Sequence, residues 1–319
     1  MKKLMLIINP ISGTGDKSGL AQLAGDRLKS AGMELDIRLT TCKGNATSMA
    51  YDAVEKGYDG VIAAGGDGTI NETAIALCNS GLPLGIIPCG SGNGLARHFG
   101  IQVDAEHAID IIARQVVKDV DYGVVNGHSF FCTCGVGFDA AVSDKFARQN
   151  HRGLLMYLKS AIEAYLNFRP TDYIITANGR VITEKAFLVA CCNTTQYGNN
   201  AYIAPAADIA DGLLDVTIIH AGNIFNDAIV GIDLMSGQLN HNLRIDTFKS
   251  SEISIMRKED GPAHIDGEPV KLPRLLNVSC RHHGLKVFTP EVIEPVTPFV
   301  TPIVSRWEEF VTTINRLLH

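Results

Sequence analysis

The sequence predicts an N-terminal α/β domain built on a parallel sheet, followed by a second domain that is mostly an antiparallel β-sandwich. From residue 1 to about 125, short apolar stretches alternate with helical patterns, which is typical of a parallel sheet flanked by helices. Beyond about residue 125, strand patterns follow one another, and Asn178-Gly179 between two of them favours a hairpin with a type I′ turn. A length of 319 residues is more than one hydrophobic core usually accommodates, which favours two domains.

The N-terminal half contains four expected strands and four expected helices. The strands are residues 4–8, 35–39, 61–64 and 84–87, and the helices are residues 20–31, 47–56, 71–77 and 105–116. In an open parallel sheet, ligands bind beyond the carboxyl ends of the strands. We therefore expect the functional site at the residues that follow these strands: Asn9, Thr41, Gly65 and Pro88.

The second half contains the expected hairpin of residues 173–177 and 180–183, and further strands at residues 187–192, 214–220, 252–256, 276–280 and 285–288. We divide the chain into residues 1–125, residues 126–289 and a C-terminal segment of residues 290–319. That segment begins as a stiff proline-rich linker and ends as an amphipathic helix with Val304, Trp307, Val311, Ile314 and Leu318 on one face. The helix can pack on its own protein, form a homodimer contact or lie on a membrane surface.

A second amphipathic segment is expected within the second domain. It carries four cations and no acid, at Lys145, Arg148, Arg152 and Lys159. Such a helix can contact a membrane surface, or it can be an ordinary helix with a solvated basic face.

The overall composition excludes several classes of partner. The formal net charge of −6 gives no general attraction to nucleic acid or to an anionic membrane, so we expect no nucleic-acid partner. Eight cysteines without a C-x-x-C pair indicate reduced thiols of a cytoplasmic protein. The apolar run of residues 4–8 is too short for a signal peptide, and no stretch approaches the roughly 20 apolar residues that span a bilayer.

The most informative stretch is residues 61–72, in which the pattern of a buried strand ends at three glycines around Asp67 and a helix begins. Glycine permits positive φ values and close backbone approach, while N–H groups and a helix N-terminus attract an anion. Because a carboxylate beside phosphate needs a cation or a transferable proton between them, Asp67 indicates Mg²⁺ binding or general-base chemistry. An ordinary tight turn, in which Asp67 caps the helix, is the alternative.

Other phosphate-binding loops fit the sequence less well. No G-x-G-x-x-G follows the first strand, and Asp16 precedes Lys17 where a P-loop needs glycine. A dinucleotide dehydrogenase or a P-loop NTPase is therefore disfavoured.

Four motifs together resemble the diacylglycerol kinase catalytic-domain family of lipid kinases, which includes bacterial diacylglycerol kinases, sphingosine kinases and ceramide kinases. They are Asn-Pro-Ile-Ser-Gly at 9–13, Gly-Gly-Asp-Gly-Thr-Ile-Asn-Glu at 65–72, Pro-Cys-Gly-Ser-Gly-Asn-Gly-Leu-Ala-Arg at 88–97 and His-Ile-Asp-Gly-Glu at 264–268. The resemblance extends to about Phe288. It implies a nucleotide-binding α/β domain, a β-sandwich domain and an active site in the cleft between them.

The resemblance also assigns roles to individual residues. A cradle for the phosphates and nucleotide of ATP would be formed by Asn9, Ser12, Gly13, Thr41, Gly66, Gly68, Thr69, Asn71, Glu72, Gly90, Ser91, Gly92 and Asn93. Asp67 matches the family's essential aspartate, near the metal and the triphosphate. Glu268, and after it Asp266, would accept the proton of the attacking lipid hydroxyl, because the turn at Gly267 can present both carboxylates. A solvated hairpin tip is the alternative for this turn.

Two further groups match metal ligands of the family. Asp121 matches an acid in its metal network, although a surface-loop carboxylate fits the sequence equally well. Asp208, Asp211 and the carbonyl of Leu213 match the ligands of a structural Mg²⁺ in bacterial members, and these oxygen ligands suit a hard cation. A metal-free turn is the alternative.

The third motif departs from the bacterial diacylglycerol kinase pattern, G-T-x-N-D, because Gly94 replaces the acid. Its G-S-G-N form is more similar to sphingosine and ceramide kinases. We therefore predict an ATP- and Mg²⁺-dependent kinase that phosphorylates a primary hydroxyl of diacylglycerol or of a sphingoid-type lipid and contacts the membrane peripherally. An NAD kinase-like enzyme acting on a soluble hydroxyl and a non-catalytic nucleotide- or lipid-binding regulator are the alternatives.

Overall fold

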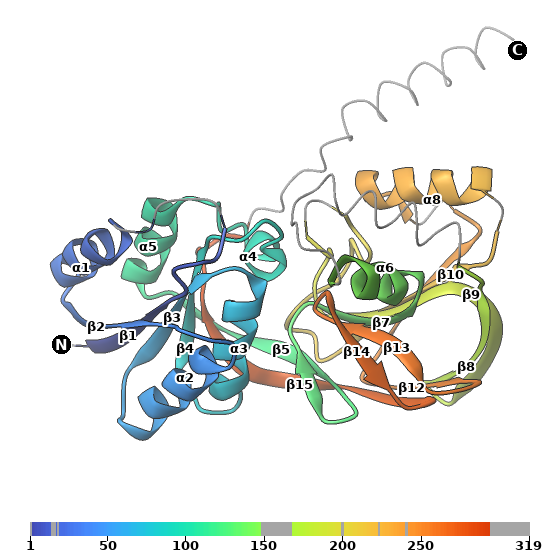
Figure 1. The fold of residues 1–319 in the computed structure, drawn as a ribbon, viewed down its shortest axis with the longest axis horizontal. Helices are drawn as coiled ribbons and strands as arrows, with labels where there is room; N and C mark the ends of the chain where they lie inside the picture. Colours follow the sequence, from blue (N-terminus) through green and yellow to red (C-terminus); the bar gives the residue numbers. More distant parts are fainter. Residues whose placement is uncertain are drawn as a thin grey trace, which may run out of the picture.

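The computed structural model describes residues 2–13, 17, 19–147, 168–198, 201–222, 224–239 and 242–293, with the side chains of residues 144–147 and 224–229 excluded. Figure 1 shows two parts side by side, the N-terminal one with a sheet between helices and the second one rich in strands. The first part is parallel and the second is mostly antiparallel, so the predicted fold class is confirmed.

The first part contains β1 (Lys2–Ile8), α1 (Leu20–Ser30), β2 (Met33–Leu39), α2 (Asn45–Glu55), β3 (Gly60–Gly65), α3 (Asp67–Leu77), β4 (Pro83–Pro88), α4 (Gly94–His98) and α5 (Ala105–Arg114). Strands β2, β1, β3 and β4 lie side by side in that order, all parallel. Helices α1 and α5 pack together on one face of this sheet, and α2 and α3 on the other (Figure 1). Because helices cover both faces, β3 is buried throughout, which explains its uninterrupted apolar composition. Every element predicted for this half is present, although α3 begins four residues earlier than expected and α4 was not predicted.

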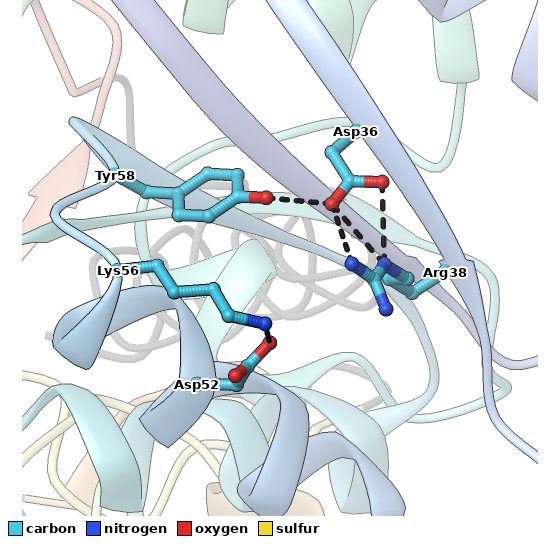
Figure 2. A network of polar contacts seen from close by, with 5 residues as sticks. All are labelled: Asp36, Arg38, Asp52, Lys56 and Tyr58. Atoms are coloured by element: carbon cyan, nitrogen blue, oxygen red, sulfur yellow. Dashed lines mark hydrogen bonds and ion pairs between the residues drawn. The ribbon is translucent and has the colours of Figure 1, made fainter.

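Strand β2 forms the edge of this sheet and carries a network of polar side chains (Figure 2). Asp36 accepts hydrogen bonds from the Tyr58 hydroxyl at 2.6 Å and from the Arg38 guanidinium at 2.9 Å. The hydrogen bonds from Arg38, and next those from Tyr58, lower the pKa of Asp36. At the C-terminal end of α2, the C-cap residue Lys56 pairs with Asp52 at 2.7 Å. Charged side chains on an edge strand oppose pairing with another chain, so we assign this network a structural role.

The second part contains β5 (Val117–Val125), β6 (His128–Phe130), β7 (Thr133–Gly137), α6 (Phe138–Ala147), β8 (Thr171–Ala177), β9 (Arg180–Cys192), β10 (Leu214–His220), α8 (Ile224–Ser236), β11 (Ile245–Ser250), β12 (Glu252–Arg257), β13 (Gly261–Ile265), β14 (Glu268–Leu272) and β15 (Leu275–Phe288). The β8–β9 hairpin turns at Asn178 and Gly179, both with positive φ, as the sequence predicts. The β13–β14 hairpin turns in the same way at Asp266 and Gly267, with φ of 48° and 78°. This second turn places the residues of the fourth motif on a tight corner.

Strands β5 and β15 connect the two parts of the molecule (Figure 1). Strand β15 pairs antiparallel with β12 and β5. Its residues 286–287 pair parallel with β4 and thereby extend the parallel sheet of the first part. The two strands predicted at 276–280 and 285–288 are one strand with an irregular register between Arg281 and Leu285. The predicted domain limits at residues 125 and 289 stay predictions.

Two predicted segments lie largely outside the described residues. Helix α6 is described as far as Ala147, so most of the predicted basic helix cannot be placed, and the same holds for the whole predicted C-terminal helix. Within the described residues, no helix has the length and apolar character needed to cross a bilayer. All eight cysteines are free.

Candidate active site

Three glycine-containing loops meet at the carboxyl ends of β1, β3 and β4. Gly13 has a φ of 68°, and a Cβ at this position would overlap the carbonyl oxygen of Cys89. A Cβ on Gly90 would lie 2.7 Å from the Cα of Gly66, so these two backbones are in direct contact. Only glycine permits such approaches, which explains why three separate motifs require it. The structure therefore brings the first three motifs together.

Polar contacts hold the loop after β1 against the loop after β3. The Asn9 side chain donates from Nδ2 to Thr69 Oγ1 at 3.0 Å, and Ser12 Oγ donates to the Asn9 carbonyl at 3.1 Å. Lys17 Nζ donates to the same carbonyl at 2.7 Å and to the carbonyl and hydroxyl of Ser12. Burial lowers the pKa of Lys17. Sequence reasoning missed this lysine, because its motif only imitates a P-loop, yet its ammonium lies in the predicted phosphate cradle.

The N-terminus of α3 points out of this junction. Gly66 is the N-cap of α3 and provides no side-chain hydrogen bond to it. A Cβ built on Gly68 would meet nothing within 4 Å, so the backbone is accessible there. The first N–H groups of a helix lack partners within the helix and carry partial positive charge. This end of α3 is therefore suited to bind a phosphate group.

The Asp67 carboxylate bridges the second and third motifs. It accepts hydrogen bonds from the backbone N–H groups of Asn93 at 2.8 Å and Gly94 at 2.7 Å, and a Cβ on Gly92 would lie 2.7 Å from its Oδ2. Asp67 therefore binds the start of α4, in addition to beginning α3. Each of its two oxygens accepts one of these N–H groups, and a carboxylate oxygen has a further lone pair that can bind a cation.

The other residues of the third motif have distinct environments. The Asn93 side chain is buried and makes both its hydrogen bonds with the backbone of Gly90, at 2.9 Å and 2.7 Å. It closes the loop, and its carboxamide is thereby occupied. Ser91 is exposed at the tip of the same loop. Of these predicted nucleotide ligands, Ser91 and the backbone of Gly92 are better placed than the Asn93 side chain.

The loop after β2 is attached to α3 through Glu72. The Glu72 carboxylate accepts the Gly44 N–H at 2.8 Å, and its carbonyl accepts the Thr47 hydroxyl at 2.8 Å. Thr41 is exposed and donates from both its N–H and its hydroxyl to Asn45 Oδ1. Glu72 thus supports this loop, and Thr41 remains accessible beside it.

The second part reaches the glycine loops through Asp266. Asp266 accepts hydrogen bonds from the backbone N–H groups of residues 131–133, at 2.7 to 2.9 Å, and from Asn71 Nδ2 at 3.0 Å. Burial raises its pKa to about 6, although the three backbone N–H groups and His264 act to lower it. Asn71 lies one helical turn after Asp67 on α3, so both project from the same face. Asp266 therefore joins the hairpin to the helix that carries Asp67.

Glu268 differs sharply from Asp266. It is exposed and pairs with Lys43, from the loop after β2, at 2.9 Å. This ion pair bridges the two parts of the molecule at the surface. An exposed carboxylate can exchange its partner for a substrate hydroxyl, whereas the hydrogen bonds of Asp266 to residues 131–133 and to Asn71 connect parts of the fold. The ranking of Glu268 above Asp266 as a proton acceptor stays a prediction.

The Cys132 thiol lies between the two sides of the site. Burial raises the pKa of Cys132, and the nearby carboxylates of Asp266 and Asp67 raise it further. A Cβ on Gly94 would lie 3.3 Å from its Sγ. Asp67 and the turn that precedes Glu268 therefore both lie close to Cys132, in the same region of the molecule.

The predicted metal ligands are only partly brought together. Asp121 lies in β5, where its side chain is fully buried, and one of its oxygens accepts the Gly212 N–H at 2.6 Å. Asp211 pairs with Lys249 at 2.6 Å and accepts the Leu213 N–H, while Asp208 accepts the Ala210 N–H. Asp121 is thus no surface-loop residue. The set of Asp208, Asp211 and Leu213 stays a prediction.

A buried polar cluster beside the hairpin was not predicted. His264 Nε2 lies 2.9 Å from Asp139 Oδ2, which also accepts the Tyr197 hydroxyl at 2.9 Å. His264 is 1 % exposed, and its Nδ1 faces the Gly267 N–H at 3.4 Å. The cluster connects α6 to the turn at residues 266–267. The position of His264 within the fourth motif was the available signal, but its partner is distant in sequence.

The site thus combines an anion-binding helix N-terminus in a parallel α/β part with carboxylates presented by an antiparallel part. This arrangement can bind a phosphate group beside a proton acceptor, and the family models that match the chain assign it to the class of kinases. The family model described as "Diacylglycerol kinase catalytic domain" matches residues 3–125, and the model described as "YegS C-terminal NAD kinase beta sandwich-like domain" matches residues 132–289.

Relatives over most of the length agree with this class. The chain is 31% identical to a diacylglycerol kinase of Bacillus subtilis over 274 residues, which cover 84% of this chain and 90% of the relative. It is 28% identical to a diacylglycerol kinase of Mycobacterium tuberculosis over 300 residues, covering 88% and 96%. A crystal structure of a candidate diacylglycerol kinase from Bacillus anthracis strain Sterne superposes with a TM-score of 0.78 at 26% identity, covering 92% and 98%. The chain belongs to the diacylglycerol kinase catalytic-domain family, and the resemblance drawn from its motifs is confirmed.

Proposed function

We propose that this kinase transfers the γ-phosphoryl group of ATP, with Mg²⁺, to the primary hydroxyl of diacylglycerol or of a sphingoid-type lipid. The observation that carries the proposal is the 3.0 Å hydrogen bond from Asn71 to Asp266. It connects the helix that starts at Asp67 with the turn that precedes Glu268. Phosphate-binding groups and a proton acceptor from different parts of the chain therefore lie around one region.

The residues on the nucleotide side fit a metal-bound triphosphate. The N-terminus of α3 and the Lys17 ammonium would bind phosphate oxygens. The Asp67 carboxylate has free lone pairs and the oxygen chemistry that Mg²⁺ prefers. When bound, Mg²⁺ would neutralise negative charge on the phosphoryl group during transfer.

Glu268 would act on the lipid side. Its carboxylate accepts the proton of the lipid hydroxyl, whose oxygen then forms a bond to the γ-phosphorus. The bond from that phosphorus to the bridging oxygen breaks, and ADP leaves. Because the pair of Glu268 with Lys43 is exposed, it is weak enough to be exchanged for the substrate.

Gly94 keeps the sphingoid-type lipids among the substrates. A side chain here would point at Cys132 Sγ and the carbonyl of Tyr197. An aspartate at this position, as in the bacterial pattern, would add a second carboxylate close to Asp67. Beside Asp67, this chain therefore has one negative charge fewer than the bacterial pattern, and in this respect it matches the G-S-G-N form.

Labelled ATP, Mg²⁺ and a panel of lipids in detergent micelles test the proposal, with NAD offered in parallel because the second family model is described as NAD kinase-like. We expect label in diacylglycerol or a sphingoid base, and its loss in Asp67→Asn. Asp52→Asn, which removes a surface acid of α2, is the matched control and should leave transfer unchanged. Label in NAD alone, or ATP binding without any product, would overturn the proposal.

Membrane contact follows from the proposed substrate, because the lipid hydroxyl lies at a bilayer surface. The sequence offers the basic segment of residues 145–159 for this contact, and the C-terminal helix for a membrane or homodimer contact. Replacing Arg148 and Arg152 with glutamate should reduce sedimentation with anionic vesicles. Equal sedimentation of variant and wild type would reject the basic segment.

A further inference from the structure

A bulge in β15 wraps around the buried carboxylate of Asp121. The register of β15 on β5 pairs Arg281 with Tyr122 and Leu285 with Val120, so residues 282–284 all lie opposite Asp121. Gly284 completes the bulge, because a Cβ there would overlap the Tyr122 ring. Bulges of this kind re-aim side chains out of the regular ladder. Here they bring two histidines to one carboxylate.

The geometry of the cluster is compact. Asp121 Oδ1 accepts the His283 N–H at 2.7 Å and faces His282 Nδ1 at 2.9 Å. The two imidazole rings stack with centroids 3.6 Å apart. One ligand atom from each of the three side chains can be chosen so that all lie within 4.8 Å of one another. The His282 side chain is 52% exposed while that of Asp121 is fully buried, so the cluster has a closed base and an open side.

The ligand types select the metal. Two imidazoles and one carboxylate suit Zn²⁺ and similar divalent transition metals, whereas Mg²⁺ prefers oxygen ligands alone. Zn–N bonds of about 2.0 Å place tetrahedral ligand atoms roughly 3.3 Å apart. The distance of 2.9 Å between His282 Nδ1 and Asp121 Oδ1 is close to this value, whereas the exposed His283 ring has to leave its stack on His282 and turn a nitrogen toward them. We propose that Asp121, His282 and His283 bind a Zn²⁺-class ion, separate from the Mg²⁺ of phosphoryl transfer.

The backbone contacts of Asp121 support this role. Its bonds from the His283 and Gly212 N–H groups hold the carboxylate in place whether or not an ion is bound. The contact with His282 Nδ1 has to be exchanged, and the Cys280 thiol is a further side-chain neighbour of the carboxylate. The ion would also compensate a buried negative charge that otherwise has hydrogen-bond donors as its main partners.

The location indicates a structural ion. Strands β5 and β15 connect the two parts of the molecule, and the Gly284 carbonyl accepts the Asn79 N–H, just beyond α3, at 2.7 Å. An ion at Asp121 would therefore fasten this junction. Because the ion would bind only the folded state, the free energy of unfolding should rise with the zinc concentration.

Zinc binding to untagged, chelator-treated full-length protein, followed by calorimetry and by competition with a zinc indicator, tests the proposal without ATP or lipid. We expect one Zn²⁺ per chain, and a loss of affinity of roughly 100-fold or more in His282→Asn/His283→Asn, since removing even a supporting partner of a ligand costs about 10- to 100-fold. Asparagine tolerates the positive φ of 52° at His283 and keeps its backbone N–H. Histidine variants are preferable to Asp121 variants, because loss of the buried carboxylate endangers the fold.

His128→Asn is the matched control, since His128 is an exposed histidine of β6 outside the cluster. It should bind Zn²⁺ as the wild type does. Zinc should raise the thermal midpoint of the wild type and of this control, but not that of the double variant. Equal affinity in the double variant, or no zinc binding by the wild type, would overturn the proposal and would leave the proposed kinase function unaffected.

Discussion

Replacing Gly90 with alanine tests the contact between the loops after β3 and β4. The added Cβ would lie 2.7 Å from Gly66 Cα and 3.0 Å from Asn93 Oδ1, whereas ordinary contacts begin at 3.4 Å. The two backbones must therefore separate by about 0.7 Å. Gly90 has no positive φ, so packing alone is perturbed. Overpacking of this kind costs about 1–3 kcal/mol.

Two measurements separate the consequences of Gly90→Ala. We expect chemical denaturation to show a free energy of unfolding lower by about 1–3 kcal/mol, and calorimetry to show weaker ATP binding, because the phosphate-binding loops no longer meet. Gly25→Ala is the control: Gly25 lies within α1, and a Cβ there meets nothing within 4 Å. It should raise stability by about 0.5–1 kcal/mol and leave ATP binding unchanged. If Gly90→Ala binds ATP like the wild type and is as stable, the inferred junction is wrong.

Three further changes address single groups. Lys17→Met should weaken ATP binding about tenfold, a loss of roughly 1.4 kcal/mol, whereas Lys56→Met at the end of α2 should leave it unchanged. Calorimetry that shows equal affinities for the wild type and Lys17→Met would exclude Lys17 from the phosphate site. Glu268→Gln should lower kcat about 10²- to 10⁴-fold with ATP affinity retained, and steady-state kinetics with unchanged turnover would assign the proton to another group. Burial lowers the pKa of His98 to about 4, because the folded state favours the neutral imidazole. The stability that neutral His98 contributes is complete above pH 6.5 and is lost as the pH falls toward 4. In denaturant titrations, the free energy of unfolding of the wild type should therefore fall by roughly 3 kcal/mol more than that of His98→Asn between pH 7 and 4. The same pH dependence of this free energy in both proteins would contradict the prediction.

The local signals in the sequence predicted the α/β half well. An apolar run that ends at Gly65 and the pair Asn178-Gly179 each determine a strand end or a turn from a few neighbouring residues. Parallel strands buried on both faces also leave a clear apolar pattern. These features need little information from distant residues.

Features that depend on distant partners were not predictable in the same way. The bulge at residues 282–284 exists because β15 pairs with β5, which lies far away in the sequence. The burial of Asp121 results from three segments far apart in the sequence. The resemblance to a family proposed the site residues, whereas their contacts separate the supporting side chains, such as Asn93 and Asp266, from the accessible ones.

The most direct test of the central claim is a crystal structure of the protein with Mg²⁺ and a non-hydrolysable ATP analogue. We expect the phosphates at the N–H groups of residues 66–68 and beside Lys17, with Asp67 near the metal and the Glu268 carboxylate facing the γ-phosphate. A nucleotide bound elsewhere, or one whose γ-phosphate faces away from the 266–268 turn, would contradict the claim that these loops and the hairpin form one site.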